Sequence, residues 1–208
     1  MENSIAYRYL VDQISATGAQ KLDGYYPKIM EEIFDWERDE VEEIIWNTFY
    51  KNSDTDLACF LPKLQKYDGI KALKEALLKC SVPSGDSLNI AKELYEQTNE
   101  IGYLDVFKKN IEMSSNKSPI VAMLIYLKPS DELYKIFIDI YIYEDNETVR
   151  DSAIIGILYN KKYIQDPHDV HEIIKKKNLL KLFDKNNADE RRSMIKALEN
   201  KELEQYLE

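Results

Sequence analysis

The stretch DNETVRDSAIIGILY, residues 145–159, carries the pattern on which the fold prediction for this chain depends. Its apolar residues recur at positions 149, 153 and 157, with two more at 154 and 158, so they share one face of an α-helix. Asn146 and Glu147 supply the polar residues that favour a helix start just before that face. Because such a helix is unstable alone in water, we expect helices before and after it to cover its apolar face.

The same pattern recurs upstream at a nearly constant interval when the alanines are used as markers. The four marked triplets have alanines 33, 31 and 31 residues apart and are Asp56-Leu57-Ala58, Asn89-Ile90-Ala91, Ile120-Val121-Ala122 and Asp151-Ser152-Ala153. A turn signal precedes each of them, at residues 53–54, 83–86, 114–116 and 144–146. Periods of this length are typical of stacked helix pairs, and a short side chain at one fixed place lets two helices approach closely.

Further helices are predicted from cap residues and from apolar residues at helical spacing. They cover residues 4–17, 26–36, 38–51, 67–80, 103–113, 131–143, 167–177 and 188–200, with a short apolar segment at 179–183. A turn is expected at Asp23-Gly24. The helix over residues 38–51 would have a solvent face made of four acids, Asp39, Glu40, Glu42 and Glu43.

Asp145, Val149, Arg150 and Ala153, followed by apolar positions 154, 157 and 158, resemble the second helix of a HEAT repeat. The helix-turn-helix units on either side are similar to that family's layout, although the Val-Arg pair occurs in this unit only. The resemblance implies an all-α fold without a sheet, in which antiparallel helix pairs stack into a right-handed alpha-solenoid. The second helices of such a solenoid line a concave face that holds other macromolecules. No activity is implied.

The length and the repeat pattern together predict the domain organisation. The 208 residues are 44% hydrophobic, which is enough for a sizeable core. We expect a single elongated helical-repeat domain over residues 1–208, with repeats at 38–159. Capping helices would occupy residues 1–37 and 160–208.

The charge and the cysteine content indicate the kind of partner and the cellular compartment to expect. The formal net charge of −10 repels nucleic-acid phosphates and anionic lipids, so we expect a basic protein partner, with no nucleic acid and no membrane. Cys59 and Cys80 lack metal-type spacing and fit buried thiols in a reducing cytosol, with a disulfide between them as the alternative. No signal-peptide core or long apolar run occurs, which predicts a cytoplasmic protein.

Most of the acidity lies towards the start of the chain. Residues 1–159 hold 28 Asp and Glu against 17 Lys and Arg, and residues 31–56 alone hold 10 acids against Arg38 and Lys51. Aromatic residues are interleaved with these acids, namely Phe34, Trp36, Trp46 and Tyr50. A negative surface with aromatic anchors would attract and hold a basic protein. The alternative is that the acids form solvated helix faces and the aromatic residues form the cores.

Few residues suggest a catalytic, metal-binding or anion-binding role. His168 and His171 have i, i+3 spacing and acids nearby, which suggests a metal site; the alternative is a helix start with exposed histidines. The run of lysines at 175–177 suggests an anion patch or lysines that complement a helix end. No nucleophile elbow or phosphate loop occurs, so we expect no enzyme activity, no cofactor and no metal.

Two classes of function stay open from the sequence. The first is a non-catalytic protein-binding module with an acidic surface, one form of which is an immunity or antitoxin-type inhibitor of a basic, nuclease-like partner. The second is an enzyme or nucleic-acid-handling protein similar to the DNA-alkylation-repeat glycosylases. Those relatives by fold use a basic groove, whereas this chain is acidic there.

Partner-binding residues are predicted from the outward register of the second helices and from the acidic stretch. They are Trp36, Glu40, Glu43, Glu93, Gln97, Leu124, Lys128, Asp151, Ile155 and Tyr159. Leu124 and Ile155 would form the apolar centre of an interface, or else be covered by the next repeat. Arg150 is expected to form an ion pair with an acid on an adjoining repeat, such as Asp145 or Asp151.

Overall fold

The computed structural model describes residues 2–16 and 25–206, and these residues contain helices and no β-strand. The all-α prediction is confirmed for them. The chain divides into two compact units, residues 1–106 and 107–208, and each unit is described by itself. None of the described helices combines the length and apolar character needed to cross a membrane. The turn predicted at Asp23-Gly24 lies outside the described residues.

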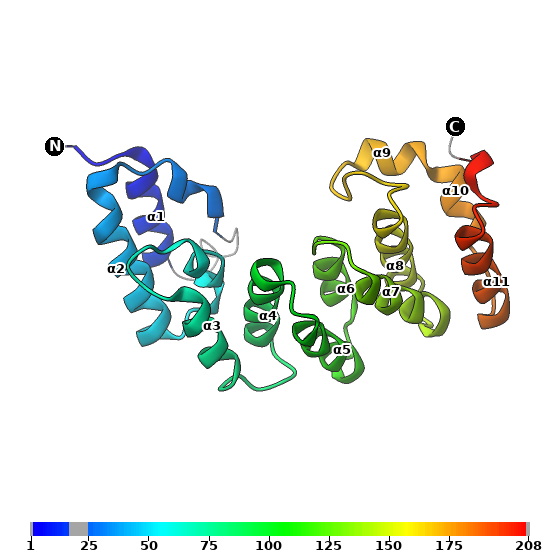
Figure 1. Cartoon of the computed structure of the whole chain (residues 1–208), viewed down its shortest axis with the longest axis horizontal. Helices are drawn as coiled ribbons and strands as arrows, with labels where there is room; N and C mark the ends of the chain where they lie inside the picture. Colours follow the sequence, from blue (N-terminus) through cyan, green and yellow to red (C-terminus); the bar gives the residue numbers. More distant parts are fainter. Residues whose placement is uncertain (1, 17–24, 207–208) are drawn as a thin grey trace. The chain divides into compact units, whose positions relative to one another are not determined.

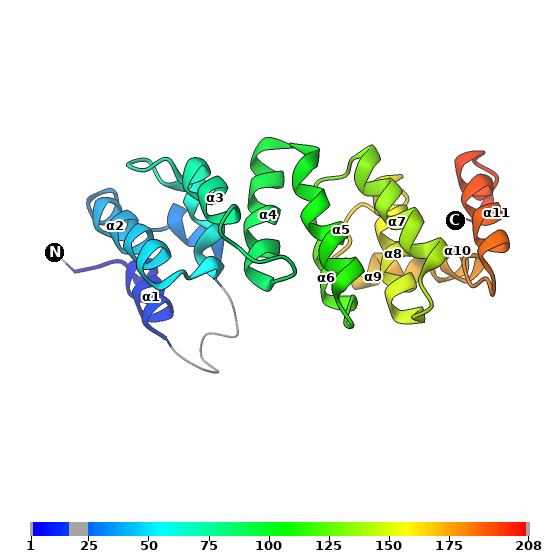
Figure 2. The same cartoon turned by 90° about the horizontal axis from the view of Figure 1, so that it is seen from below.

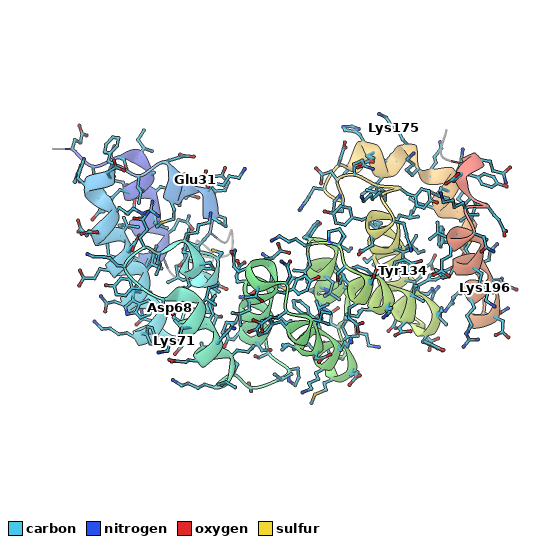
Figure 3. The ribbon with its side chains drawn as sticks, viewed as in Figure 1. Glu31, Asp68, Lys71, Tyr134, Lys175 and Lys196 are labelled. Atoms are coloured by element: carbon cyan, nitrogen blue, oxygen red, sulfur yellow. The ribbon has the colours of Figure 1, made fainter. Side chains whose placement is uncertain are left out.

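Unit 1 is built from four α-helices joined by short 3-10 helices. In chain order they are α1 (Ile5–Ser15), η2 (Pro27–Glu31), α2 (Asp35–Asn52), η3 (Thr55–Cys59), η4 (Leu61–Lys63), α3 (Gly69–Leu77), α4 (Gly85–Thr98) and η5 (Ile101–Tyr103), after which α5 (Leu104–Met113) begins. α1 lies beside α2, and α3 lies beside α4 (Figures 1 and 2). The core between them includes Ile45, Phe60 and Leu73, each fully buried. Asp68 begins α3 by accepting the N–H of Lys71 at 2.9 Å (Figure 3).

Unit 2 begins within α5, at Phe107, and contains the helices that follow α5. They are α6 (Ser118–Ile125), α7 (Asp131–Tyr143), α8 (Glu147–Asn160), α9 (Val170–Lys175), α10 (Lys177–Leu182), α11 (Ala188–Glu199) and the 3-10 helix η6 (Glu204–Tyr206). α8 packs against both α6 and α7, and α11 packs against α7 (Figure 1). Phe107, Phe137 and Phe183 are buried in this unit. The helix predicted over residues 167–177 is shorter in the structure, where it is α9, and α10 begins at Lys177.

The helix on which the fold prediction depends is α8. Asn146 caps it by accepting the N–H of Val149, and Val149, Ala153 and Ile157 are buried as the spacing predicts. Gly156, which the alanine markers did not single out, lies against Phe137 of α7. A Cβ at this position would lie 2.5 Å from the ring of Phe137, so the α7–α8 packing requires glycine here.

The marker alanines do not all behave alike. Ala58, Ala91 and Ala153 are buried, whereas Ala122 is only partly buried. The helix expected around Ala58 is only the five-residue 3-10 helix η3, so the prediction of an α-helix there is wrong. Pro62 explains the difference, because it has no N–H for the carbonyl of Ala58 and its ring would clash with that carbonyl in an α-helix.

The predicted helix over residues 26–36 is also wrong. Only η2 forms there, and α2 already begins at Asp35, three residues before the predicted start at residue 38. The Glu37 carboxylate accepts the N–H of Phe34 at 2.9 Å, which satisfies a backbone donor at the first turn of α2. η2 and α2 are therefore two separate helices, and α2 begins after Phe34.

Both cysteines are free thiols and partly buried. Burial, with a further contribution from the Glu93 carboxylate, raises the pKa of Cys59 to about 12. Burial also raises the pKa of Cys80. Both thiols therefore favour the protonated form at neutral pH, and the alternative of a disulfide between them is not observed.

The C-terminal end of α7 is held by cationic side chains. Arg150 donates to the carbonyl oxygens of Glu144 and Asp145, at 3.1 and 2.5 Å. Arg191, which is buried, donates to the carbonyl oxygens of Ile142 and Glu144, at 3.0 and 3.3 Å. Arg150 therefore binds backbone carbonyls at a helix end, where carbonyls lack helical partners, instead of forming the predicted ion pair with a carboxylate.

Replacing Arg150 by alanine is expected to lower the free energy of unfolding by about 1.5 kcal/mol, because two carbonyl groups lose a charged donor. Thermal and urea denaturation followed by circular dichroism would measure the change. Arg150→Lys, which keeps the charge with fewer donors, should fall between the two proteins. An unchanged melting temperature in Arg150→Ala would contradict this role.

Candidate functional site

The candidate site is one face of the first half of α2, at positions 36, 40 and 43. Residues at this i, i+4, i+7 spacing share a helix face, and Trp36, Glu40 and Glu43 are all exposed, as required for the predicted partner contacts. Phe34 and Asp39 extend the face, and both are exposed. The acidic–aromatic surface is defined here as Phe34, Trp36, Asp39, Glu40 and Glu43.

Two aromatic rings stand out on this surface. The side chains of Phe34 and Trp36 are 49% and 45% exposed, and their ring centroids lie 6.1 Å apart. Trp46 differs, because its ring stacks on Tyr67 at 4.4 Å and is partly buried. Of the four interleaved aromatic residues, Phe34 and Trp36 therefore form an exposed pair at the start of α2, Trp46 is packed, and Tyr50, near the end of α2, is exposed beside Trp46. Phe34 was not among the predicted contacts, although its place beside the acids could have indicated it.

Contacts with α1 hold the acidic–aromatic surface in place. Glu37 is fully buried and accepts the backbone N–H of Ser4 at 2.6 Å and its hydroxyl at 2.7 Å. The hydroxyl of Tyr7 donates to Glu40 at 2.9 Å, and this hydrogen bond is the main cause of a raised pKa of Tyr7. These contacts fix the start of α2 to Ser4 and to Tyr7 of α1.

The cationic side chains near the acidic–aromatic surface neutralise only part of its negative charge. Arg38 turns inward and bonds Glu42 at 3.1 Å, so it does not lie over the exposed acids. Lys66 pairs with Asp39 at 3.0 Å, mainly through a hydrogen bond that raises the pKa of Lys66. Glu31 on η2 adds a further exposed carboxylate, which lies 4.0 Å from the ammonium group of Lys63 (Figure 3).

The prediction that all four acids of residues 38–51 face solvent is wrong for Glu42. Its side chain is 1% exposed, and it accepts the backbone N–H groups of Gln65 and Lys66 at 2.9 and 2.8 Å in addition to Arg38. A carboxylate can be buried at this place because three donors surround it. Helical spacing cannot reveal this, since Gln65 and Lys66 belong to another element.

The buried carboxylate of Glu37 predicts a dependence of stability on pH. Burial alone would raise its pKa, but the hydrogen bonds from the Ser4 hydroxyl and from the N–H groups of Phe34 and Ser4 outweigh burial and lower the pKa below 4.5. At pH values between that lowered pKa and 4.5, Glu37 is mostly protonated in the unfolded chain and mostly ionised in the folded chain. The stabilisation is therefore complete above pH 4.5 and is lost as the pH falls below it.

We expect wild type to exceed Glu37→Gln in free energy of unfolding at pH 7, with the difference shrinking as the pH is lowered from 5 towards 3. Urea denaturation at each pH measures both proteins. A difference that is constant over this range would show that the Glu37 charge does not stabilise the fold.

The remaining predicted contacts are scattered over the two units. In unit 1, Gln97 is exposed but Glu93 is largely buried beside Lys92, at 3.5 Å, and burial raises the pKa of Glu93. In unit 2, Lys128 is exposed and Tyr159 is partly buried. Leu124 is fully buried, so the prediction that it contacts a partner is corrected. The helical register places Leu124 on the predicted outward face of its helix, but α6 packs against α8 and Leu124 is covered.

Asp151 and Ile155 are the two predicted contacts of unit 2 that the structure brings together. Both line a cleft of about 320 Å³ between α8 and the segment that contains α10, together with Glu147, Phe183 and Asp184. The pKa of Asp151 is raised by burial first and then by the charges of Glu147 and Asp184. Sequence reasoning missed Glu147 and Asp184 as neighbours of Asp151, and Asp184 comes from a different element.

The histidine segment shows the arrangement of a helix start. Asp169 caps α9 by accepting the N–H groups of His171 and Glu172, at 2.9 and 3.2 Å. The His168 ring stacks on Tyr126 at 3.9 Å. Within residues 2–16 and 25–206, no three His, Cys, Asp or Glu side chains form a group that could hold a metal ion.

Comparison with known proteins gives no assignment: no protein-family model, curated protein or solved structure matches the chain. The resemblance to a HEAT repeat therefore rests on the residues of α8 and on the spacing of the alanines. Among the described residues, the acidic–aromatic surface and the cleft beside α8 are two features that bring predicted contact residues together.

Proposed function

We propose that this protein is a non-catalytic protein-binding module that docks a basic protein on the acidic–aromatic surface of α2. The observation that carries the proposal is the pair of exposed rings, Phe34 and Trp36, beside the exposed carboxylates of Glu40 and Glu43. Aromatic side chains at the centre of an interface provide much of its binding energy. Surrounding carboxylates select a positively charged partner.

The charge of the first unit supports this partner class. Residues 1–106 carry 20 Asp and Glu against 11 Lys and Arg, whereas residues 107–208 carry 18 against 17. The field of the first unit would accelerate the encounter with a basic protein, and the effect would weaken with added salt. The rings would then slow dissociation once they are desolvated.

An inhibitor of a nuclease-like protein is the specific form that we propose for this module. Enzymes that cleave nucleic acids need basic surfaces to bind phosphates. An acidic surface with two aromatic anchors could cover such a surface and exclude the substrate. This function would be exercised in the cytoplasm and would require no cofactor.

We further propose that the helix pairs are HEAT-like repeats of an alpha-solenoid. The pairs α3–α4 and α7–α8 support this within their own units, because each consists of two adjacent helices joined by a short turn. The spacing of 31 residues between Ala91, Ala122 and Ala153 adds to the support. Burial of Gly156 against Phe137 fits the tight helix pairing of such repeats.

The test is the binding of a purified basic partner by surface variants. Partners captured from the native host at low salt would be identified, purified and titrated against the protein. Trp36→Ala should weaken binding by about 30-fold or more, as expected for a central aromatic anchor. Glu40→Gln with Glu43→Gln should lower mainly the association rate and reduce its dependence on salt.

Two exposed positions in unit 2 provide matched controls. Tyr206→Ala removes an exposed aromatic ring and Glu112→Gln removes an exposed carboxylate, both outside the acidic–aromatic surface. Neither should change the affinity. If the α2 variants bind the partner as wild type does, the proposed surface is wrong.

A further inference from the structure

A stripe of aromatic and acidic residues runs along almost the whole length of α2. This element is one unbroken helix of 18 residues (Figure 1), and its positions 36, 39, 43, 46 and 50 share a face at alternating intervals of three and four. The same spacing is found in the seam of a coiled coil, where a second helix packs along the first. We define the α2 stripe as Trp36, Asp39, Glu43, Trp46 and Tyr50.

The far end of the α2 stripe carries a second group of aromatic rings. Tyr50 is 45% exposed, and its ring centroid lies 4.6 Å from that of Trp46. Trp46 also stacks on Tyr67, with the ring centroids 4.4 Å apart, which holds the indole in place. The stripe therefore has an aromatic group at each end, Phe34 with Trp36 at the first and Trp46 with Tyr50 at the second.

A cleft of about 340 Å³ lies beside the second aromatic group. Its apolar lining comes from α2, α3 and α4 and includes Phe49, Tyr50, Ala72, Ala76 and Ile90. Its charged lining includes Glu75, Lys79 and Asp86, which are of both signs, so the cleft does not by itself select a charged group. One large apolar side chain of a partner would fit there, as the anchor residues of interfaces do.

Negative charge lies between the two aromatic groups. Asp39, Glu40 and Glu43 are exposed and lie one to two turns after Trp36. Lys66 pairs with Asp39 at 3.0 Å and so offsets one of these three charges. A partner that covers the whole stripe therefore needs apolar side chains at both ends and basic side chains between them.

We propose that the partner presents an amphipathic α-helix, apolar at both ends of one face and basic between them, that packs along the α2 stripe. The inference deepens the proposed function and rests on it. An extended segment would need backbone partners, but the N–H and C=O groups in the interior of α2 are bonded within the helix. A helix satisfies its own backbone groups, and its side chains at intervals of three and four match the stripe. Tyr50 follows Trp36 by 14 residues, or about 21 Å of helix, so the partner helix needs about four turns.

The experiment titrates the full chain, labelled with ¹⁵N, with a synthetic helical peptide of about four turns. One face of the peptide carries leucine at both ends and arginine between them. The chain has two tryptophans, Trp36 and Trp46, so their indole N–H signals report on the two ends of the stripe. Both signals should shift with a saturable dependence on concentration. A peptide of the same composition, with its leucines on the face opposite its arginines, should bind at least tenfold more weakly.

Variants of the stripe test its second half. Tyr50→Ala removes the exposed ring of the second aromatic group and should weaken peptide binding at least tenfold. Glu43→Arg places a positive charge between the two groups and should weaken binding by a larger factor. Tyr206→Ala, which removes an exposed ring from unit 2, is the matched control and should bind as wild type does. Thermal melts of the three variants establish that they are folded, and the Trp46 indole signal tests the second group without any variant.

A shift of the Trp36 indole signal alone, or wild-type binding by Tyr50→Ala, would overturn the inference. The proposed function would stand in that case, because the partner would contact only the acidic–aromatic surface. Equal binding of the two peptides, or binding of neither, would also overturn the inference. Failure of the proposed function is distinct, since it appears as wild-type binding of the purified basic partner by Trp36→Ala and by the paired Glu40→Gln and Glu43→Gln change.

Discussion

Replacing Gly69 by alanine is expected to lower the free energy of unfolding by about 3 kcal/mol, at the upper end for overpacking of a core. Gly69 is the first residue of α3 and is buried against η4, where a Cβ would overlap the backbone carbonyl group of Leu61. A flexible side chain could move aside, but this carbonyl belongs to Leu61, the buried first residue of the 3-10 helix η4. The methyl group can therefore be accommodated only if α3 moves away from η4.

Gly85→Ala is the matched control for this change. Gly85 is also the first residue of its helix, α4, but a Cβ there would have no atom within 4 Å. Alanine at that position should be neutral or stabilise the fold by about 0.5 kcal/mol, because it restricts the unfolded chain. Urea denaturation of both variants measures the contrast. Equal stabilities of the two variants would show that the α3–η4 approach is looser than described.

Replacing Glu42 by glutamine is expected to lower the free energy of unfolding by about 3 kcal/mol, as expected for breaking a buried ion pair. All three partners of Glu42, the Arg38 guanidinium and the N–H groups of Gln65 and Lys66, are donors. A glutamine side chain has one acceptor oxygen and one NH₂ group. At least one of these partly buried donors would consequently face the NH₂ group and lose its acceptor.

Glu43→Gln is the control, because it makes the same chemical change at the adjacent, exposed position of α2. Its effect on stability should stay within about 0.5 kcal/mol. Chemical denaturation of both variants measures the contrast. Similar stabilities of the two variants would contradict the buried role of Glu42.

These variants relate stability to the proposed function. Glu37 and Glu42 hold α2 from the inside, to α1 through Ser4 and to the segment after η4 through Gln65 and Lys66. Glu40 and Glu43, on the same helix, remain exposed. One stretch of acids thus serves two purposes, and a loss of binding has to be separated from a loss of folding for each residue.

Sequence reasoning was most reliable where the signal is local. The helices α7 and α8 were predicted within a few residues, because cap residues and apolar spacing act over one or two turns. It was least reliable for residues 26–36 and for the segment around Ala58. There Pro62 and the contact of Glu37 with Phe34 replaced the expected α-helices with 3-10 helices.

The candidate surface was predicted in part. The density of acids and aromatic residues indicated Trp36, Glu40 and Glu43, and all three are exposed. The periodic register failed at Leu124, which is buried, and gave no indication that Glu147 and Asp184 share a cleft with Asp151. Register along one helix locates a face, but the neighbouring element decides whether that face is covered.

By itself, the sequence determined that this chain is helical and that its acidity is concentrated in the first unit, because both properties follow from residues close together in the chain. Only the tertiary structure decided which acids are buried and which glycines are indispensable. Glu42 meets its backbone donors at Gln65 and Lys66, and Gly156 meets Phe137, over 18 or more residues of intervening chain. Such contacts depend on how elements pack, which a pattern along the chain does not specify.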